Sequence, residues 1–448
     1  MNPVQSMQER VEGHGARQQR RSVPAVTLLA VAVLLSVTAA GSMAWAVIDV
    51  GSDGTDGTLS VTSNRIIDLS LAVTGSWNQP GNGHGVYDPD KWAVVFKYDS
   101  LYVDTLKTVT FTNHPSGAPV VWLVQRGVRI RGTVDVSGKT GLLAGGYAEG
   151  GPGGFRGGRG YLSVNSLGSA GMGPGGGNYL ATTSGAGGGY GYLGEIPALC
   201  LTYGNPRILP LIGGSGGSGG GTTQYGGGSG GGAILIASNR SIYLSGALWA
   251  KGGASDRYFV NPSWYYSGGG GSGGGIRLVA NTVVGTASGL VASGALAAGF
   301  GNDGGGGRIR MEANSINLTG SSDPIYTSLA PLDNDTAVIW PPSDAPAVRV
   351  TTVAGVPVPA DASGTLNPPG GMATSTTGQA EVLCEATNVP TTGWKVTVRV
   401  VLKSGAQFSV DATLQGGSLA LSTWRALLPQ SLPASDVVVV QARAMKLP

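Results

Sequence analysis

Charged side chains are scarce in this sequence, and their scarcity narrows the classes of protein that it can encode. Aspartate, glutamate, lysine and arginine make up 12 % of the 448 residues, about half the usual share, while hydrophobic residues make up 41 %. A disordered chain is normally highly charged and poor in apolar residues, so this composition favours a packed fold. No block of basic residues follows residue 46. We therefore expect no nucleic-acid partner, since such binding depends on clustered side chains that neutralise phosphates.

Cysteine and histidine are nearly absent, which leaves few residues for metal binding or catalysis. The two cysteines, Cys200 and Cys384, lie far apart in the sequence and can form one disulfide bond or remain free. Cys384 alternates with apolar residues in EVLCEAT, a pattern that predicts a small buried side chain. No stretch matches a metal-ligand motif, a phosphate loop or a catalytic triad. We therefore expect no cofactor and no catalytic residue.

The first 46 residues have the layout of an export segment. A basic stretch ends in the pair RR, an uncharged apolar run fills residues 23–48, and AWA near its end supplies the small residues that signal peptidase requires. One interpretation is a signal peptide that is cleaved after Ala46. The other is an uncleaved membrane anchor, because the run is long enough to span a bilayer. Both place the rest of the chain outside the cytoplasm, since the positive flank stays inside.

The remaining chain divides into three zones of different composition. Residues 47–141 alternate between apolar and polar β-formers, as in VRIRGTVDV, and predict strand after strand. Residues 142–340 hold most of the 79 glycines, with short β-patterns between the glycine tracts. Residues 341–448 begin with a linker marked by prolines at 341, 342 and 346, and they carry about seven strand patterns at hairpin spacing. This last zone predicts an immunoglobulin- or fibronectin-III-like β-sandwich with Trp394 in its core.

Four segments share one internal pattern. Lined up from their first residues, they are APVVWLVQRGVRIRGTVDVSGKTG (118–141), GGAILIASNRSIYLSGALWAKGGA (231–254), GGIRLVANTVVGTASGLVASGA (274–295) and GGRIRMEANSINLTG (306–320). Each opens with strand residues, turns at a polar corner and continues into a second short strand. One such coil cannot bury its apolar side chains alone, whereas stacked coils can. We therefore predict an all-β fold, a right-handed parallel β-helix (solenoid) with Gly-rich insertions, followed by the β-sandwich.

The glycine tracts themselves leave alternatives open. As insertions between coils they either lie flat on the solenoid or pack as polyproline-II-like segments, because glycine allows close backbone approach. The competing interpretation is a flexible linker, which predicts Gly and Ser with few apolar residues. AILIAS, IRLVAN and RIRMEAN recur at the same place relative to the glycines, and this recurrence favours the solenoid.

Aromatic residues gather in one long insertion, DRYFVNPSWYYSGGGG. The candidates for ligand binding there are Tyr258, Trp264, Tyr265 and Tyr266, together with the neighbouring Phe259. Aromatic faces on a loop can stack against sugar rings or pack onto a partner protein. The alternative is that they cover the side of the solenoid.

Two groups of charged residues are weaker candidates. Asp49, Asp53 and Asp56 in DVGSDGTDG could ligate calcium, although the spacing is not that of an EF-hand and Asp also makes turns. In GNDGGGGRIRMEAN, the residues nearest to the acid, base and calcium-ligand set of a polysaccharide-degrading enzyme are Asp303, Arg308, Arg310 and Glu312. The last three alternate along one strand face, and we favour a solvated charged face there.

Low-complexity motifs connect the chain with a wider group of proteins. The stretches VGSDGTDGTLSVTS, TVTFTNHPSGAPVVWLVQRGVRIRGTVDVSG, ILPLIGGSGGSGGG and GGGSGGGIRLVAN resemble parts of large, mostly uncharacterised exported bacterial proteins. Those proteins carry glycine-rich β-helical repeats and a C-terminal sandwich. The resemblance implies export, solenoid architecture and a surface or matrix role, and it brings no catalytic motif.

These features together predict an exported structural or adhesive protein of the cell surface or extracellular matrix, without catalytic activity. Its expected partners are surface glycans or other matrix components, with membrane contact only through an uncleaved N-terminal segment. Two alternatives remain open. One is a carbohydrate-active β-helix enzyme, either a polysaccharide lyase or a glycoside hydrolase, and the other is a carbohydrate-binding protein.

Overall fold

β-strands dominate the regular secondary structure of the chain. The computed structural model describes residues 48–447 except 144, 164–166, 180–183, 222–223, 262–263, 298–301, 334–335, 359–377, 403–406, 430 and 433–437, and it describes the backbone alone for 257–261, 264–266 and 438. The predicted export segment, residues 1–46, lies outside this range. The described residues contain no α-helix, and hence no helix among them could cross a membrane. The prediction of an all-β fold is confirmed.

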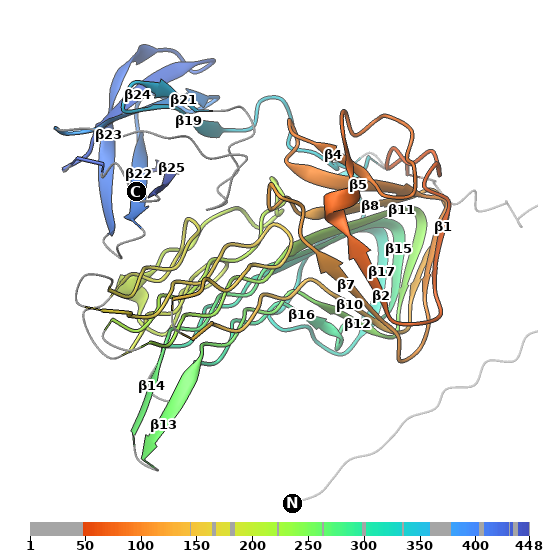
Figure 1. The fold of residues 1–448 in the computed structure, drawn as a ribbon. Helices are drawn as coiled ribbons and strands as arrows, with labels where there is room; N and C mark the ends of the chain where they lie inside the picture. The colour runs from red at the N-terminus through yellow and green to blue at the C-terminus, as the bar shows by residue number, and fades with distance from the viewer. Residues whose placement is uncertain are drawn as a thin grey trace, which may run out of the picture. The chain divides into compact units, whose positions relative to one another are not determined.

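The largest sheet has eleven strands and curves into a half-barrel (Figure 1). Its strands are β1 (Thr58–Val61), β3 (Val73–Thr74), β4 (Val86–Asp88), β5 (Ala93–Tyr98), β6 (Ser100–Val103), β8 (Val120–Val124), β9 (Val128–Ile130), β11 (Ala233–Leu244), β15 (Gly275–Thr286), β17 (Arg308–Thr319) and β18 (Thr327–Leu329). Every pair in it is parallel except β4 with β5. The first half of the long strand β11 pairs with β8 and its second half pairs with β9, so one long strand spans both parts of the sheet.

A second sheet of five parallel strands lies in the order β16-β12-β10-β7-β2. Its members are β2 (Arg65–Asp68), β7 (Thr108–Thr112), β10 (Thr133–Asp135), β12 (Ala247–Trp249) and β16 (Leu290–Val291). The described residues also contain two short 3-10 helices, η1 (Leu69–Leu71) and η2 (Pro197–Leu199). Strands of the two sheets alternate along the chain, since β11 leads into β12 and β15 leads into β16. The predicted repeats 231–254 and 274–295 therefore each contribute one strand to each sheet, whereas 118–141 contributes β8 and β9 to the large sheet and β10 to the second, and 306–320 contributes β17 to the large sheet alone.

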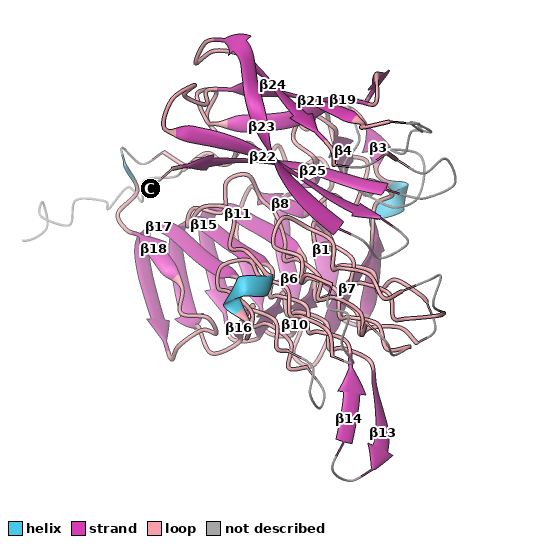
Figure 2. Ribbon diagram, turned by 90° about the vertical axis from the view of Figure 1, so that its left-hand side faces the viewer, coloured by secondary structure: helices cyan, strands magenta, loops and turns pink. Residues whose placement is uncertain are grey.

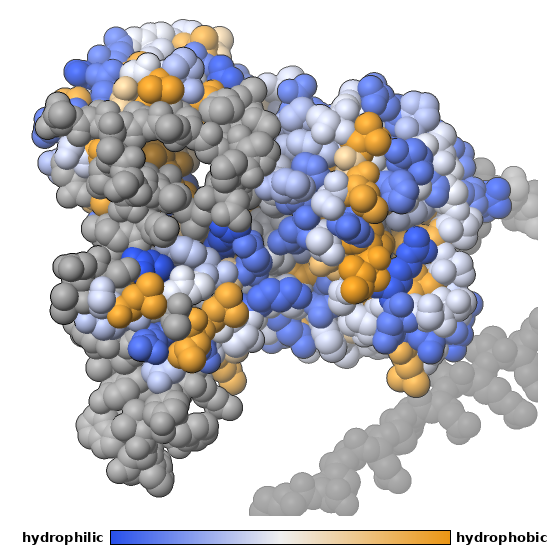
Figure 3. All heavy atoms as spheres, viewed as in Figure 1, coloured by the Kyte–Doolittle hydropathy of each residue, from blue (hydrophilic) through white to orange (hydrophobic). Residues whose placement is uncertain are grey.

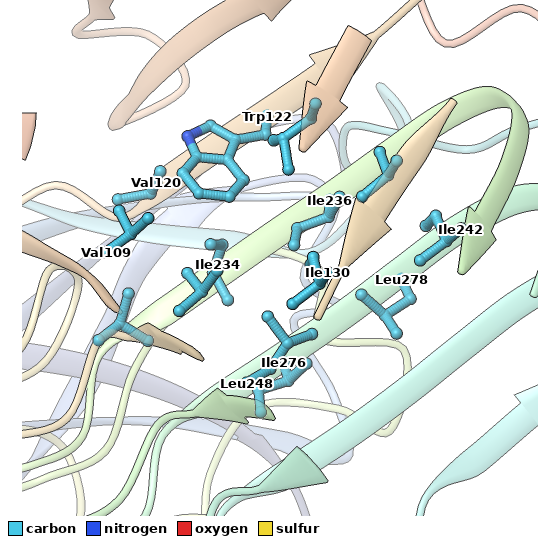
Figure 4. Packing of buried hydrophobic residues seen from close by; sticks show 14 of the residues in the cluster. Val109, Val120, Trp122, Ile130, Ile234, Ile236, Ile242, Leu248, Ile276 and Leu278 are labelled. Atoms are coloured by element: carbon cyan, nitrogen blue, oxygen red, sulfur yellow. The ribbon is translucent and has the colours of Figure 1, made fainter. Parts of the chain in front are cut away.

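Apolar side chains line up in rows across the parallel strands. Val120 pairs with Ile234, Ile234 with Ile276, and Ile276 with Ile309. All four side chains are buried, and three of them are labelled in Figure 4 beside the buried Trp122. Burying one aliphatic side chain of this size stabilises the fold by about 1.5–3 kcal/mol. Rows of this kind form the core enclosed by the two sheets.

The register differs by one residue from an alignment of the four repeated segments at their first residues. That alignment places Ala233 opposite Ile276, whereas the structure pairs Ala233 with Gly275. Likewise Gly275 pairs with Arg308 rather than with Gly307. The inward-facing aliphatic residues of the row described above decide the register of each strand, because a slip of one residue would turn these side chains to the other face of the sheet. The end of a glycine tract does not determine that register.

Glycine-rich segments pack side by side as a separate element between the strands. We call the described parts of residues 137–160, 168–178, 184–194, 213–221, 226–232, 250–256, 268–274, 292–297 and 302–307 the glycine body. Figure 2 draws these segments as loops that run alongside one another. Most of their residues are nevertheless buried.

Backbone hydrogen bonds within the glycine body repeat at every third residue. In segment 226–232, Gly226, Ser229 and Gly232 donate to Leu142, Lys139 and Val136; Gly227 and Gly230 donate to Gly158 and Phe155; Gly228 and Gly231 donate to Gly269 and Ser272. A period of three without internal hydrogen bonds is the geometry of polyproline II. The glycine tracts therefore pack as polyproline-II-like segments, each bonded to several neighbours. A flexible linker does not describe these buried, hydrogen-bonded residues.

The close approach of these backbones requires glycine. A Cβ atom on Gly228 would lie 1.8 Å from the carbonyl oxygen of Gly253, and one on Gly271 would lie 1.9 Å from that of Ser229. Serine stands where a short polar side chain can bond across the segments, and the Ser229 hydroxyl donates to the Glu149 carbonyl at 2.6 Å. Glycine here is a packing requirement rather than a source of flexibility.

Seven antiparallel strands make up the C-terminal part. They are β19 (Ala347–Val353), β20 (Val356–Pro357), β21 (Glu381–Thr387), β22 (Trp394–Leu402), β23 (Gln407–Gly417), β24 (Ser422–Leu427) and β25 (Val438–Lys446). Cys384 is fully buried in their core, as its alternation predicted, and Trp394 packs against that core. Cys200 and Cys384 are both free. Burial raises the pKa of the Cys384 thiol to about 12.

Candidate functional site

The aromatic candidates lie on a two-stranded antiparallel ribbon. β13 (Arg257–Asn261) pairs with β14 (Trp264–Ser267), and the ribbon projects away from neighbouring segments in both ribbon views (Figures 1 and 2). The register sets Tyr258 opposite Tyr266, Phe259 opposite Tyr265 and Asn261 opposite Trp264. The four predicted ligand-binding residues are thus brought together along one ribbon. Their side chains lie outside the described part of the structure, and their binding role stays a prediction.

The three aspartates proposed as calcium ligands are engaged separately. An Asp49 oxygen accepts from the Gly51 amide at 2.8 Å. Asp56 accepts from two backbone amides, those of Gly83 and Lys97, each at 2.7 Å. Asp53 instead receives the Lys97 ammonium group at 2.8 Å. Within the described ranges, no three His, Cys, Asp or Glu side chains come together as a metal site.

The Lys97 ammonium is a buried charge that sequence reasoning missed. Its side chain is 3 % exposed, and besides Asp53 it donates to the carbonyl oxygen of Asn78 at 3.2 Å. Partial burial acts to raise the pKa of Asp53, but hydrogen bonds from Lys97 and Thr55 outweigh it and hold that pKa below its ordinary value. The pair fixes the turn-rich segment before β1 to the C-terminal end of β5.

Replacing Asp53 by asparagine is expected to lower the free energy of unfolding by about 1–2 kcal/mol near neutral pH, because the Lys97 ammonium stays buried without its charged partner. The effect stays below that of a fully buried pair, since the Asp53 side chain is 44 % exposed. The folded pKa of Asp53 is depressed, so this stabilisation is present above the unfolded value of about 4 and is lost as pH falls through the folded pKa.

Urea unfolding near pH 7 and at a pH below the folded pKa of Asp53 measures both effects. Asp49→Asn is the matched control, because among the described residues its carboxylate accepts a hydrogen bond from the Gly51 amide and forms no ion pair. Equal stability of the Asp53 variant and wild type near neutral pH would contradict the assignment.

The charged residues of β17 share one strand face, as predicted, but that face is not solvated. Arg310 and Glu312 are 8 % and 3 % exposed, and they form an ion pair at 3.0 Å. Arg308 donates to the carbonyl oxygen of Tyr203 at 3.1 Å. Asp303 lies elsewhere, where its carboxylate accepts from the Ala297 amide. The solvated-face interpretation is therefore wrong, because chain outside the sheet covers this face.

Arg277 completes the buried charge cluster and was not among the predicted residues. Its guanidinium donates to Glu312 at 2.8 Å and to the carbonyl oxygen of Ile339 at 3.3 Å. Burial lowers the pKa of Arg277, while the charge of Glu312 opposes that shift. The segment around Ile339, which the sequence placed at the end of the glycine-rich zone, covers the cluster. The sequence could have pointed to Arg277, because GGIRLVAN, which contains it, aligns with GGRIRMEAN and its two arginines.

No protein-family model, curated protein or solved structure matches the chain. The class that the described residues define is an all-β protein of stacked parallel strands with a glycine body. Its function has to be argued from the geometry of those residues.

Proposed function

We propose that this chain is an exported structural or adhesive protein of the cell surface or extracellular matrix, without catalytic activity. In this proposal the two parallel sheets are the coils of a right-handed β-helix, with the hand that parallel crossovers generally take. The C-terminal strands form an immunoglobulin- or fibronectin-III-like sandwich. Surface glycans or other matrix components are the proposed partners.

The glycine body is the observation that carries the proposal. Its segments contribute little side-chain surface and engage one another through backbone hydrogen bonds in several directions. Such an element acts as a rigid support that holds connecting segments, including the ribbon β13–β14, away from the strands (Figure 1). Binding residues commonly stand on loops positioned by a rigid scaffold. A support of this kind suits adhesion and structure.

Localisation and adhesion in the source organism test the proposal together. An antibody against the C-terminal strands is expected to label intact cells. A strain lacking the gene is expected to adhere less to surfaces, and the full chain supplied in trans should restore adhesion. Antigen found only inside the cell, or unchanged adhesion of the deletion strain, would overturn the proposal.

The enzymatic alternative is tested separately with purified protein. Two of the four residues that suggested it, Arg310 and Glu312, lie in the buried charge cluster with Arg277. Incubation with acidic and neutral polysaccharides, followed by sizing of the polymer, is expected to show no shortening. Shortening of any of these polymers would support a lyase or hydrolase in place of the structural role.

A further inference from the structure

One half of the half-barrel sheet turns its outer face to solvent. It is formed by β1, β6, β9 and the second halves of β11, β15 and β17. In these strands the residues that point into the core are apolar, and Leu101, Val128 and Ile242 are each buried. The alternate residues therefore point to the solvent side. Figure 3 shows hydrophilic and neutral residues on the visible surface of the strand-rich part, with a band of hydrophobic residues between them.

Two rows cross this outward face. One row is mostly hydroxylated, since Thr58 pairs with Ser100, Ser241 with Thr282 and Thr282 with Ser315. The other row runs through Ser60, Tyr102, Arg129, Tyr243, Val284 and Asn317. We call Tyr102, Arg129 and Tyr243 the tyrosine–arginine row. Arg129 is exposed and Tyr243 is 38 % exposed, so the row is open to a ligand.

The tyrosine–arginine row is held in place by its own contacts. The Arg129 guanidinium lies 5.1 Å from the centre of the Tyr243 ring. The Tyr102 hydroxyl donates to Asp104 at 2.9 Å and accepts from Arg131 at 3.3 Å. Neighbouring strands lie about 4.8 Å apart, so the two tyrosines, on either side of β9, stand roughly 10 Å apart. Sites built on strands hold their geometry better than sites on loops.

The face carries positive charge that its own carboxylates do not neutralise. Arg126 pairs with Asp99 at 3.0 Å, and Arg131 lies 4.0 Å from Asp104. Arg129 forms no ion pair with any described residue, and its cation contacts only a ring. A guanidinium of this kind can still offer its planar fork to a carboxylate.

We propose that this face binds an anionic polysaccharide whose sugars bear carboxylate groups. The polymer lies across the strands along the tyrosine–arginine row. The two tyrosine rings stack against sugar faces, Arg129 receives a carboxylate between them, and the hydroxylated row bonds to sugar hydroxyls. This inference names a ligand class for the proposed adhesive role and rests on that role for its biological meaning. It concerns a surface separate from the ribbon β13–β14.

The test uses residues 47–448, without the predicted export segment, with polygalacturonate as the probe and dextran as the neutral comparison. Wild-type protein is expected to bind polygalacturonate, more weakly at higher salt, and not to bind dextran. Arg129→Gln is expected to weaken binding at least about tenfold, since a hydrogen-bonded charge pair is lost. Tyr243→Ala should weaken binding, whereas Tyr243→Phe, which keeps the ring, should not.

Arg65→Gln is the matched control, because Arg65 is an exposed arginine on β2 of the other sheet. It is expected to bind as wild type does, and thermal unfolding confirms that each variant is folded. Absence of polygalacturonate binding, or equal losses in Arg129→Gln and Arg65→Gln, would overturn the inference. Tighter binding of dextran sulfate would overturn the carboxylate assignment, and equal competition by duplex DNA would reduce the effect to unspecific anion binding.

These outcomes separate the inference from the proposed function. If the chain is on the cell surface and promotes adhesion but does not bind polygalacturonate, only the inference fails. If purified protein binds through Arg129 while the antigen is found only inside the cell, the proposed function fails and the binding face stands.

Discussion

Gly228→Ala is expected to lower the free energy of unfolding by about 3 kcal/mol or more. The Gly228 amide donates to Gly269 and its carbonyl accepts from Gly217, each at 2.9 Å. A methyl group there would stand 1.8 Å from the Gly253 carbonyl oxygen, which is backbone and cannot rotate away. One neighbouring segment must therefore move. Overpacking of this kind costs about 1–3 kcal/mol, and each buried hydrogen bond broken adds about 1–3 kcal/mol.

Gly127→Ala is the matched control for this prediction. Its nearest neighbours, atoms of Ser241, would lie 3.7 Å from the new methyl group, an ordinary contact distance. Alanine also restricts the unfolded chain, so stability is expected to stay unchanged or rise by up to about 1 kcal/mol. Urea midpoints followed by tryptophan fluorescence compare the two variants with wild type. Equal stability of Gly228→Ala and Gly127→Ala would contradict the packing of the glycine body.

Glu312→Gln is expected to destabilise the fold by about 3–5 kcal/mol, which is the usual cost of breaking a buried ion pair. Glu312 is the single carboxylate between two guanidinium groups, with its side chain 4 % exposed and those of Arg277 and Arg310 1 % and 10 % exposed. The neutral amide would leave two positive charges buried without a counterion. Urea unfolding near neutral pH measures the loss.

A triple variant separates the value of the cluster from the penalty of breaking it. The row that holds Arg277 and Arg310 contains Val95, Val121 and Leu235 in the preceding strands. Arg277→Leu and Arg310→Leu would continue that apolar row, and Glu312→Leu would extend the neighbouring row of Leu123, Ala237 and Val279. Replacement of a buried ion triad by packed apolar residues is often neutral or stabilising, so this variant is expected to be at least as stable as wild type. A triple variant as unstable as Glu312→Gln would contradict the argument.

The strand content of the fold could be predicted because it depends on local pattern. Two-residue alternation in VRIRGTVDV and the recurring segments gave the strands and their parallel partners in outline, since the apolar residues of successive segments must share a core. The alignment of the segments differed by one residue from the observed strand register, because it was anchored at the ends of the glycine tracts rather than at Ile234 and Ile276. A period of two makes such a slip a change of face.

Other features depend on contacts between distant parts of the chain and could not be predicted. Burial of Glu312 follows from the chain around Ile339, which composition indicated only as the approach to a proline-rich linker. The neighbours of segment 226–232 include residues 136–142, and no periodicity in a glycine tract identifies its partners. The tyrosine–arginine row needs three strands in register, β9 and β11 from two of the repeats and β6 from outside them. Tyr102, Arg129 and Tyr243 were visible as β-formers and charges, but not as neighbours.

The threefold bonding of the glycine body also affects how order in this protein should be measured. Polyproline II is a major conformer of unfolded chains. Far-ultraviolet circular dichroism of the native protein is therefore expected to suggest more disorder than exists. Amide hydrogen exchange is expected to show order instead. Exchange should be slow at Gly227, Gly228 and Gly230, because their amides are hydrogen-bonded and buried. A stretch that looks random to one spectroscopy would then be among the best-protected parts of the molecule.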